Sequence, residues 1–299
     1  MVLYSAVIYP SDFFDVYIED YFRSVFGQTN QNFELLLILD GIDKFKIEKI
    51  VKKFNFINKK IHVVKFLNDF SPIELRQKQI EIAHEIGADI LILSDFDESV
   101  ALNRVEEILK NIKDYAFAFN DFYIVDHTLN RLDAESFFYK RKINREIVDY
   151  KEISSFNFIG LGSMALNLRK FNYSILKITP DIKALDWYMA TIVLLNRNKG
   201  IALHDTYANY RQHKDSFVGF DFKLNDKKLK QGIEVKLSHY KILKEYSKFF
   251  CYLYNEIVEL NEYLLKFGTD KYIELVNSSF DTDKFCWWEN IKTKKELGI

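Results

Sequence analysis

The sequence predicts an α/β protein in which a mostly parallel sheet is flanked by helices. Short apolar runs alternate with segments whose apolar residues recur every three or four positions, which is the pattern of strands alternating with helices. The strand-like runs are almost continuously apolar, as expected for strands buried on both faces of a parallel sheet. Glycine and proline at the segment ends supply stop and start signals for the helices.

The first half of the chain predicts four strands separated by helices. Gly27 and Gly87 fit the ends of two of these helices. The expected strands are Leu3–Ile8, Phe33–Leu39, Ile61–Phe66 and Ile90–Leu93, and the expected helices are Asp15–Phe26, Ile42–Phe54 and Pro72–Ile86. This alternation favours a doubly wound sheet.

The middle of the chain predicts fewer elements. Gly160 and Gly162, within Phe156–Leu168, indicate either close backbone approach at a pocket wall or a glycine-kinked core strand. No element is predicted between Leu132 and Ser155. The other expected elements are a helix over Leu102–Ile112, a strand over Tyr115–Val125, a turn over Asp126–Asn130 into a second strand, a helix over Asp186–Leu195 and a strand over Ile201–His204.

The end of the chain predicts a helical extension. From Ile233 to Leu264 apolar residues recur every three or four positions, as in one long amphipathic helix or two shorter ones. The polar face mixes Lys and Glu, without the basic bias of a helix that binds anionic membranes. We therefore expect an α/β domain over residues 1–225 and a helical extension over 226–299 that packs on it.

Composition excludes several classes of function. Lys plus Arg (42) and Asp plus Glu (43) nearly cancel, so no basic field favours nucleic acid. Cys251 and Cys286 indicate neither a zinc site nor a disulfide framework, which fits a reducing cytoplasm. No stretch reaches the roughly 20 apolar residues of a membrane-spanning helix. We expect a cytoplasmic protein whose membrane contact, at the inner face of the cytoplasmic membrane, is peripheral at most.

Asp95 and Asp97 follow directly after the fourth predicted strand. In open α/β sheets ligands bind outside the carboxyl ends of the strands. Two carboxylates from one turn suit a hard divalent cation that also carries substrate phosphates. The alternatives are a solvated turn or a helix N-cap, since Asp97, Glu98 and Ser99 stand just before the helix that follows.

Several motifs occur in an order that resembles the GT-A glycosyltransferases of family 2. The resemblance covers Leu3 to Ile112 well and Phe156 to Ser216 more loosely. The matching motifs are Tyr9-Pro10 after the first strand, Gln28-Thr29 before the second, Asp40-Gly41 after it, Arg76 in the helix before the fourth strand, and Asp95-Phe96-Asp97 after that strand.

This resemblance implies a GT-A (Rossmann-like) fold over residues 1–225 and a bound nucleotide-sugar donor. It places Tyr9, Pro10, Asp40 and Arg76 near the nucleoside, and an Mn²⁺ or Mg²⁺ ion on Asp95 and Asp97 at the diphosphate. Tyr210-Arg211-Gln212-His213 matches a Tyr-Arg-x-His pattern of bacterial members. The resemblance therefore implies that Arg211 holds the diphosphate and that His213 is a third metal ligand; the alternatives are a surface Arg and a neutral core His.

The resemblance also implies a catalytic base. Inverting members place an acidic residue, commonly the Asp of a Glu-Asp pair, at the start of a late helix, where it deprotonates the acceptor hydroxyl. Asp186 occupies that place, with Leu185 where Glu is usual. The alternative role for Asp186 is a helix N-cap.

These expectations combine into a predicted function. We expect a metal-dependent inverting glycosyltransferase that moves a sugar from a nucleotide-sugar donor, with UDP-sugar as the expected donor. The expected acceptor is a saccharide or lipid-linked saccharide of a bacterial surface polymer. A nucleotidyltransferase is a weaker alternative, because the loop after the first strand is Tyr-Pro-Ser-Asp rather than Gly-rich and basic. A second alternative is a catalytically inactive GT-A-like binding or scaffolding module that uses the helical extension as its partner surface.

Overall fold

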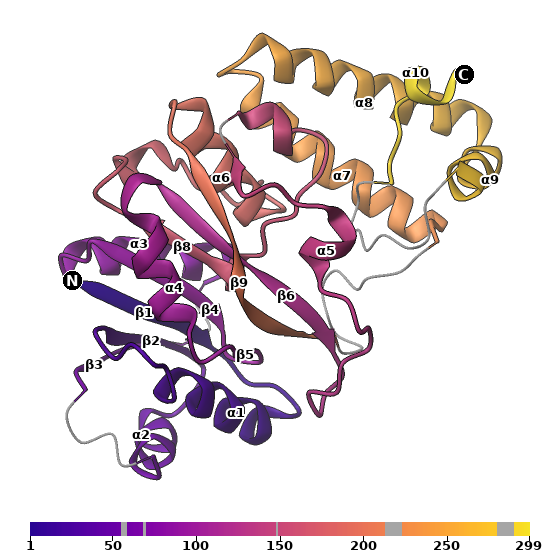
Figure 1. The fold of residues 1–299 in the computed structure, drawn as a ribbon. Helices are drawn as coiled ribbons and strands as arrows, with labels where there is room; N and C mark the ends of the chain where they lie inside the picture. Colours follow the sequence, from indigo (N-terminus) through magenta and orange to yellow (C-terminus); the bar gives the residue numbers. More distant parts are fainter. Residues whose placement is uncertain (55–58, 68–69, 148, 213–222, 280–289) are drawn as a thin grey trace.

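The computed structural model describes residues 1–54, 59–67, 70–147, 149–212, 223–279 and 290–299. Its centre is one sheet flanked by helices (Figure 1). Within the described residues the strand order is β3-β2-β1-β4-β8-β6-β9-β5, and β7 pairs with β9. The strands are β1 (Val2–Ile8), β2 (Glu34–Asp40), β3 (Ile61–Phe66), β4 (Ile90–Asp95), β5 (Ser99–Val100), β6 (Phe117–Val125), β7 (Glu146–Ile147), β8 (Met164–Asn167) and β9 (Gly200–Arg211).

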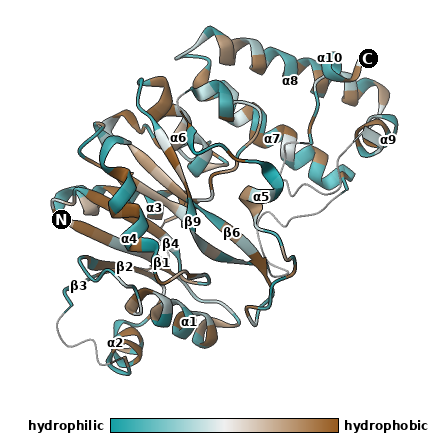
Figure 2. Ribbon diagram, in the orientation of Figure 1, coloured by the Kyte–Doolittle hydropathy of each residue, from teal (hydrophilic) through white to brown (hydrophobic). Residues whose placement is uncertain are grey.

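The four N-terminal strands form the parallel half of the sheet, as predicted. β1 lies between β2 and β4, β2 pairs with β3, and all three pairings are parallel. Apolar residues are concentrated in these strands (Figure 2), because both faces of this half are covered. The connecting helices are α1 (Phe14–Phe26), α2 (Lys44–Lys52) and α3 (Pro72–Glu85). Parallel pairing brings the ends of β1, β2 and β4 to one edge of the sheet.

The second half of the sheet is mixed. β8 is antiparallel to β4 and β6, whereas β6 and β9 are parallel to each other. β9 is much longer than the predicted strand Ile201–His204. The pairing skips three residues of β9, since Asn120 faces Leu203 and Asp121 faces Tyr207. This bulge interrupts the apolar run, and the strand then continues to Arg211.

The segments for which the sequence predicted few elements contain short helices, strands and turns. The turn at Asp126–Asn130 is present, but an isolated bridge between Val125 and Arg131 takes the place of the expected second strand. The segment Leu132–Ser155 contains α5 (Phe137–Arg141), β7 and a 3-10 turn. Gly160 lies just before a 3-10 turn, η3 (Leu161–Ser163), and Gly162 lies within it. The turn leads directly into the buried strand β8.

The C-terminal helices gather at one end of the molecule, away from α1 and α2 (Figure 1). They contact the sheet domain through α6 (Leu185–Leu195), where the His239 ring stacks on Trp187 with 3.6 Å between ring centroids. The Tyr240 hydroxyl also donates to the Ser154 carbonyl at 2.8 Å. No helix in the described ranges is long and apolar enough to cross a membrane. The remaining helices are α4 (Arg104–Asn111), α6 (Leu185–Leu195), α7 (Asp226–Leu243), α8 (Lys248–Phe267), α9 (Asp270–Ser279) and α10 (Lys294–Leu297).

A fragment that ends at Asn225 tests the predicted boundary at residues 225 and 226. Buried residues of α7 and α8, such as Ile233 and Leu260, belong to the same apolar cluster as Trp187 and the sheet residue Phe119. Because truncation would expose this cluster as an apolar patch, we expect an aggregating or much less stable fragment. Thermal melting and light scattering of fragment and full chain measure this. A soluble fragment with the full chain's melting temperature would identify the extension as a separate interaction element.

Candidate active site

Three carboxylates gather in the turn that follows β4. Asp95 ends the strand, Asp97 is half-buried, and Glu98 is only 6% exposed. The fully buried Phe96 ring fixes the turn to the core between them. The turn does not cap the next helix, because β5 intervenes and α4 begins at Arg104 with Asn103 as its N-cap residue. The capping alternative for Asp97, Glu98 and Ser99 is therefore wrong.

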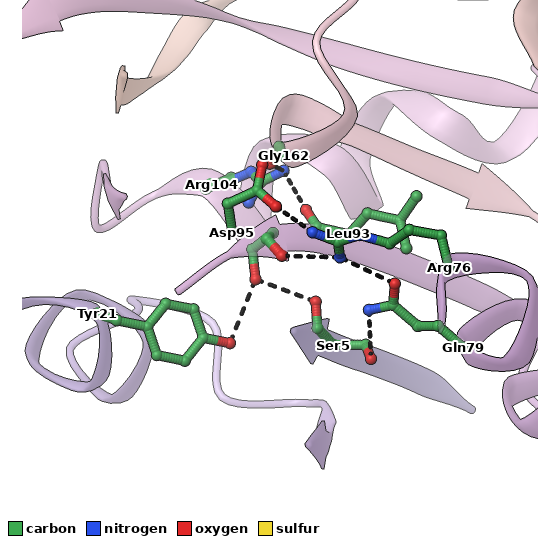
Figure 3. Close-up of polar contacts among 9 residues, drawn as sticks. Ser5, Tyr21, Arg76, Gln79, Leu93, Asp95, Arg104 and Gly162 are labelled. Atoms are coloured by element: carbon green, nitrogen blue, oxygen red, sulfur yellow. Dashed lines mark hydrogen bonds and ion pairs between the residues drawn. The ribbon is translucent and has the colours of Figure 1, made fainter. Parts of the chain in front are cut away.

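Arg76 pairs with the first of these carboxylates. It lies on α3, is 9% exposed, and donates to the Asp95 carboxylate. It also donates to Gln79 Oε1 at 3.0 Å and to the Ser94 carbonyl at 3.3 Å. Gln79 in turn donates to Ser5 Oγ at 2.8 Å, which ties α3 to β1 (Figure 3). This network holds the guanidinium in one orientation at the end of β4.

Arg104 is a second guanidinium beside the cluster, and its side chain is completely buried. One of its nitrogens, Nη2, donates to the carbonyls of Leu93 and Gly162 at 2.9 and 2.8 Å (Figure 3). The other donors reach Asn120 Oδ1 at 2.7 Å and the Tyr4 hydroxyl at 2.8 Å. Neutral groups on three strands and one turn therefore hold this buried charge in place.

The carboxylates repel one another in a poorly solvated setting. Burial raises the pKa of Asp95, and the charge of Asp97 adds to this effect while Arg76 opposes it. Burial, followed by the charges of Asp95 and Asp97, raises the pKa of Glu98 well above its usual range, with Arg104 opposing. With all groups ionised, three carboxylates face two guanidinium groups. A bound cation would relieve this excess negative charge.

The donor set fits a hard divalent cation in part. Carboxylate oxygens suit Mg²⁺ or Mn²⁺, which typically take one or two protein carboxylates and complete their shell with water and substrate phosphates. Within the described ranges, no three His, Cys, Asp or Glu side chains are arranged as a full set of metal ligands. His213, the expected third ligand, lies outside the described residues.

Tyr9, Pro10 and Asp40 lie at the same edge of the sheet. The Tyr9 ring packs edge-on against Phe96, with 4.8 Å between centroids, and remains 42% exposed. Burial of its hydroxyl, followed by the charges of Asp97 and Asp95, raises the pKa of Tyr9. Pro10 follows and is exposed, and Asp40 is half-buried where β2 ends. Three of the residues predicted to bind the nucleotide, Tyr9, Pro10 and Asp40, therefore line one edge of the sheet.

Asp186 is a separate carboxylate in the first turn of α6. Its Oδ1 atom accepts from Asn157 Nδ2 at 3.1 Å and from the Trp187 backbone N–H at 2.7 Å. Burial raises the pKa of Asp186 to about 7, and the charge of Asp95 contributes to this shift. Ala184 is the N-cap residue, so Asp186 is not the cap, although it does bind an N–H of the first turn.

Tyr210 lies within the electrostatic influence of both the turn after β4 and Asp186. Burial, followed by the charges of Glu98, Asp97, Asp95 and Asp186, raises the pKa of Tyr210. All four carboxylates therefore act on one phenol at the end of β9. The structure thus brings Asp186 and the turn after β4 to the same site.

Arg211 points to the other face of β9, because successive strand residues alternate. Its side chain is fully buried against α1, where Nη2 donates to Asp20 Oδ2 at 2.6 Å. The guanidinium carbon lies 4.1 Å from the centre of the Tyr17 ring. Nε and Nη1 have no hydrogen-bond partner within the described part of the chain. The predicted diphosphate contact of Arg211 stays a prediction.

Comparisons with known proteins identify the fold. No protein-family model matches the chain. An uncharacterized glycosyltransferase of Methanocaldococcus jannaschii is 27% identical over 145 residues, which are 48% of this chain and 46% of that protein. The solved structure of S. aureus TarS residues 1–349 with UDP-GlcNAc is 16% identical, with a TM-score of 0.57, over 81% of this chain and 66% of that one. The mannosyltransferase PcManGT of Pyrobaculum calidifontis, solved with GDP-Man and Mn²⁺, is 10% identical, with a TM-score of 0.56, over 93% and 79%.

The chain has the GT-A fold. The match to the curated relative spans about half of either chain.

Four residues near these carboxylates were not predicted as site residues. Glu98 was considered only as a helix cap, and Arg104 fell within the predicted helix Leu102–Ile112 without being singled out. Asn157 and Tyr210 lie far along the chain from the residues they serve. A charged residue on the apolar side of a predicted helix, as Arg104 is, would have been the one available signal.

Proposed function

We propose that this chain is a metal-dependent, family 2-like glycosyltransferase. It would take a nucleotide sugar, with UDP-sugar as the expected donor, and transfer the sugar with inversion to a saccharide or lipid-linked saccharide acceptor. The single observation that supports this best is that the carboxylates of the turn after β4 and the separate carboxylate of Asp186 all act on Tyr210. One group suits the donor diphosphate and the other suits the acceptor hydroxyl.

The donor side of the proposal uses the shared edge of the sheet. Tyr9, Asp40 and Arg76 would hold the nucleoside, with Pro10 shaping the loop after β1. Asp95 and Asp97 would hold Mn²⁺ or Mg²⁺, with His213 as the proposed third ligand. When bound, the cation would supply neutralisation of charge on the leaving diphosphate. The buried guanidinium of Arg104 joins Gly162 to β4, the strand that ends in this acidic turn.

The acceptor side of the proposal rests on Asp186. A carboxylate with a pKa of about 7 is poised to take a proton near neutral pH. The acceptor hydroxyl would lose its proton to Asp186 while its oxygen forms a bond to the anomeric carbon. The bond from that carbon to the diphosphate breaks, and the nucleotide leaves with the electron pair. Attack on the face opposite the leaving group inverts the configuration.

The comparisons support the donor class without choosing the nucleotide. TarS was solved with UDP-GlcNAc and PcManGT with GDP-Man and Mn²⁺. UDP remains our expectation from the sequence. The acceptor, a role in bacterial surface polysaccharide synthesis and a cytoplasmic location at the membrane's inner face belong to the same proposal.

A thermal-shift screen tests the proposal. A ligand that binds only the folded protein raises its melting temperature. We expect UDP to do so in the presence of Mn²⁺ and not in its absence, with GDP, CMP and TDP as comparisons. Slow hydrolysis of a UDP-sugar would then separate an enzyme from a binding module. Absence of a shift with every nucleotide would contradict the proposal, and consumption of a nucleoside triphosphate with a sugar phosphate would favour a nucleotidyltransferase.

A further inference from the structure

The η3 turn (Leu161–Ser163) lies against the end of β4. The backbone N–H and the hydroxyl of Ser163 both donate to the Gly160 carbonyl, at 3.1 and 2.8 Å, which fixes the turn internally. Immediately afterwards the chain enters β8, which pairs with β4 on one side and β6 on the other. The turn is therefore anchored at its C-terminal end to the centre of the sheet.

Gly162 contacts the carboxylate turn so closely that it leaves no room for a side chain. A Cβ atom on Gly162 would lie 2.5 Å from Asp95 Oδ2 and 2.8 Å from Glu98 Oε2. The backbone of Gly162 is not left-handed, so glycine is not needed there for its dihedral angles. A side chain at Gly162 is therefore excluded by the two carboxylates rather than by the backbone dihedral angles.

The same turn contacts both sides of the proposed site. Arg104 Nη2 donates to the Gly162 carbonyl and to the Leu93 carbonyl on β4, so one nitrogen clamps the turn to the strand that carries Asp95. On the other side, the Leu161 backbone lies close enough to the Asp186 carboxylate to lower the pKa of Asp186. Two consecutive residues, Leu161 and Gly162, thus lie between the carboxylates of the turn after β4 and the candidate base.

We infer that η3 is a positioning element that sets the distance between the carboxylates of the turn after β4 and the candidate base Asp186. Its positioning residues are Gly162 and Arg104. This inference rests on the proposed function. Misplacement of either carboxylate group by a fraction of an ångström would lower the rate, because the transfer needs both groups aligned on one substrate pair. A side chain at Gly162 would push Asp95 and Glu98 away from the cation and diphosphate.

Gly162→Ala tests the inference, with Gly160→Ala as the matched control. A Cβ on Gly160 meets only Ser163 Oγ, at 3.4 Å, which is ordinary contact. Isothermal titration with UDP in Mn²⁺ measures donor affinity independently of turnover. We expect Gly162→Ala to lose about 10- to 100-fold in this affinity, the usual effect of disturbing groups that orient metal ligands. Gly160→Ala should match the parent.

Arg104→Lys provides a second variant. Lysine keeps the charge but cannot hold the four acceptors of Arg104 at once, so we expect weaker UDP binding in Mn²⁺ and slower transfer. Parental affinity in a folded Gly162→Ala protein would overturn the inference. So would failure of both Gly162→Ala and Arg104→Lys to fold while Gly160→Ala folds, since the turn would then be a folding element only. Absence of UDP binding by the parent in Mn²⁺ would instead contradict the proposed function.

Discussion

Asp97→Ala is expected to abolish Mn²⁺-dependent nucleotide binding while leaving the fold intact. Asp97 is half-buried in a turn after β4, so its side chain contributes little to the core. Its charge also adds to the repulsion that raises the pKa values of Asp95 and Glu98. Removing it should therefore leave the melting temperature of the free protein unchanged or slightly higher. The loss should be confined to binding that requires the cation.

Titration of UDP with and without Mn²⁺, on parent and variant, measures this effect. Asp114→Ala is the matched control, because it removes an exposed carboxylate from the surface 3-10 helix that follows α4. The control should bind UDP like the parent in both conditions. If Asp97→Ala binds UDP in Mn²⁺ as tightly as the parent, Asp97 is not a metal ligand.

The parallel half of the fold could be predicted from the sequence because its information is local. Each of β1 to β4 is a short, largely apolar run, and two of the helices between them carry their own N-caps, Asp43 on α2 and the capping box of Ser71 and Glu74 on α3. β9 could not be predicted to its full length. Its bulge at His204–Thr206 breaks the apolar pattern, and only pairing with β6 carries the strand past it.

Some residues of the candidate site could also be predicted from the sequence and others could not. Asp95, Asp97 and Asp186 stand at element ends, and position along the chain is enough to nominate them. Arg104 contacts acceptors on β1, β4, β6 and η3, which no local pattern brings together. For Arg211, the sequence supplied a motif but not the direction of the side chain. Because side chains alternate between the two faces of β9, Arg211 points toward Asp20 and Tyr210 points toward the carboxylates.

Asp186→Asn is expected to lower the transfer rate by about 10²–10⁴-fold, the usual contribution of a general base, with little change in donor affinity. Asparagine keeps an oxygen that can accept from Asn157 and Trp187, as Asp186 Oδ1 does. In the parent, transfer should increase as pH rises through about 7, because the base must be ionised to accept the proton. The variant should lose this pH dependence along with the rate.

The same pKa predicts that the Asp186→Asn variant is more stable than the parent at pH values above the folded pKa of Asp186. The carboxyl of Asp186 has a pKa of 3.8 when exposed and of about 7 in the fold, so the folded state binds its proton more tightly. Its contribution to the free energy of unfolding is therefore most favourable below about pH 4 and declines as pH rises to about 7. Parent and Asp186→Asn should melt alike in acid, and the variant should melt at the higher temperature at pH values above the folded pKa.

Asp186→Ala separates this role from that of a helix-end hydrogen-bond acceptor. If Asp186 only accepts N–H groups at the start of α6, alanine costs around 1 kcal/mol of stability and turnover remains nearly intact. If it is the base, alanine and asparagine lower transfer equally although their stabilities differ. Asp181→Asn and Asp205→Asn, both at exposed carboxylates, are the controls and should transfer like the parent. Near-parental transfer by Asp186→Asn would place the base elsewhere, and loss of transfer in either control would identify that residue as the alternative.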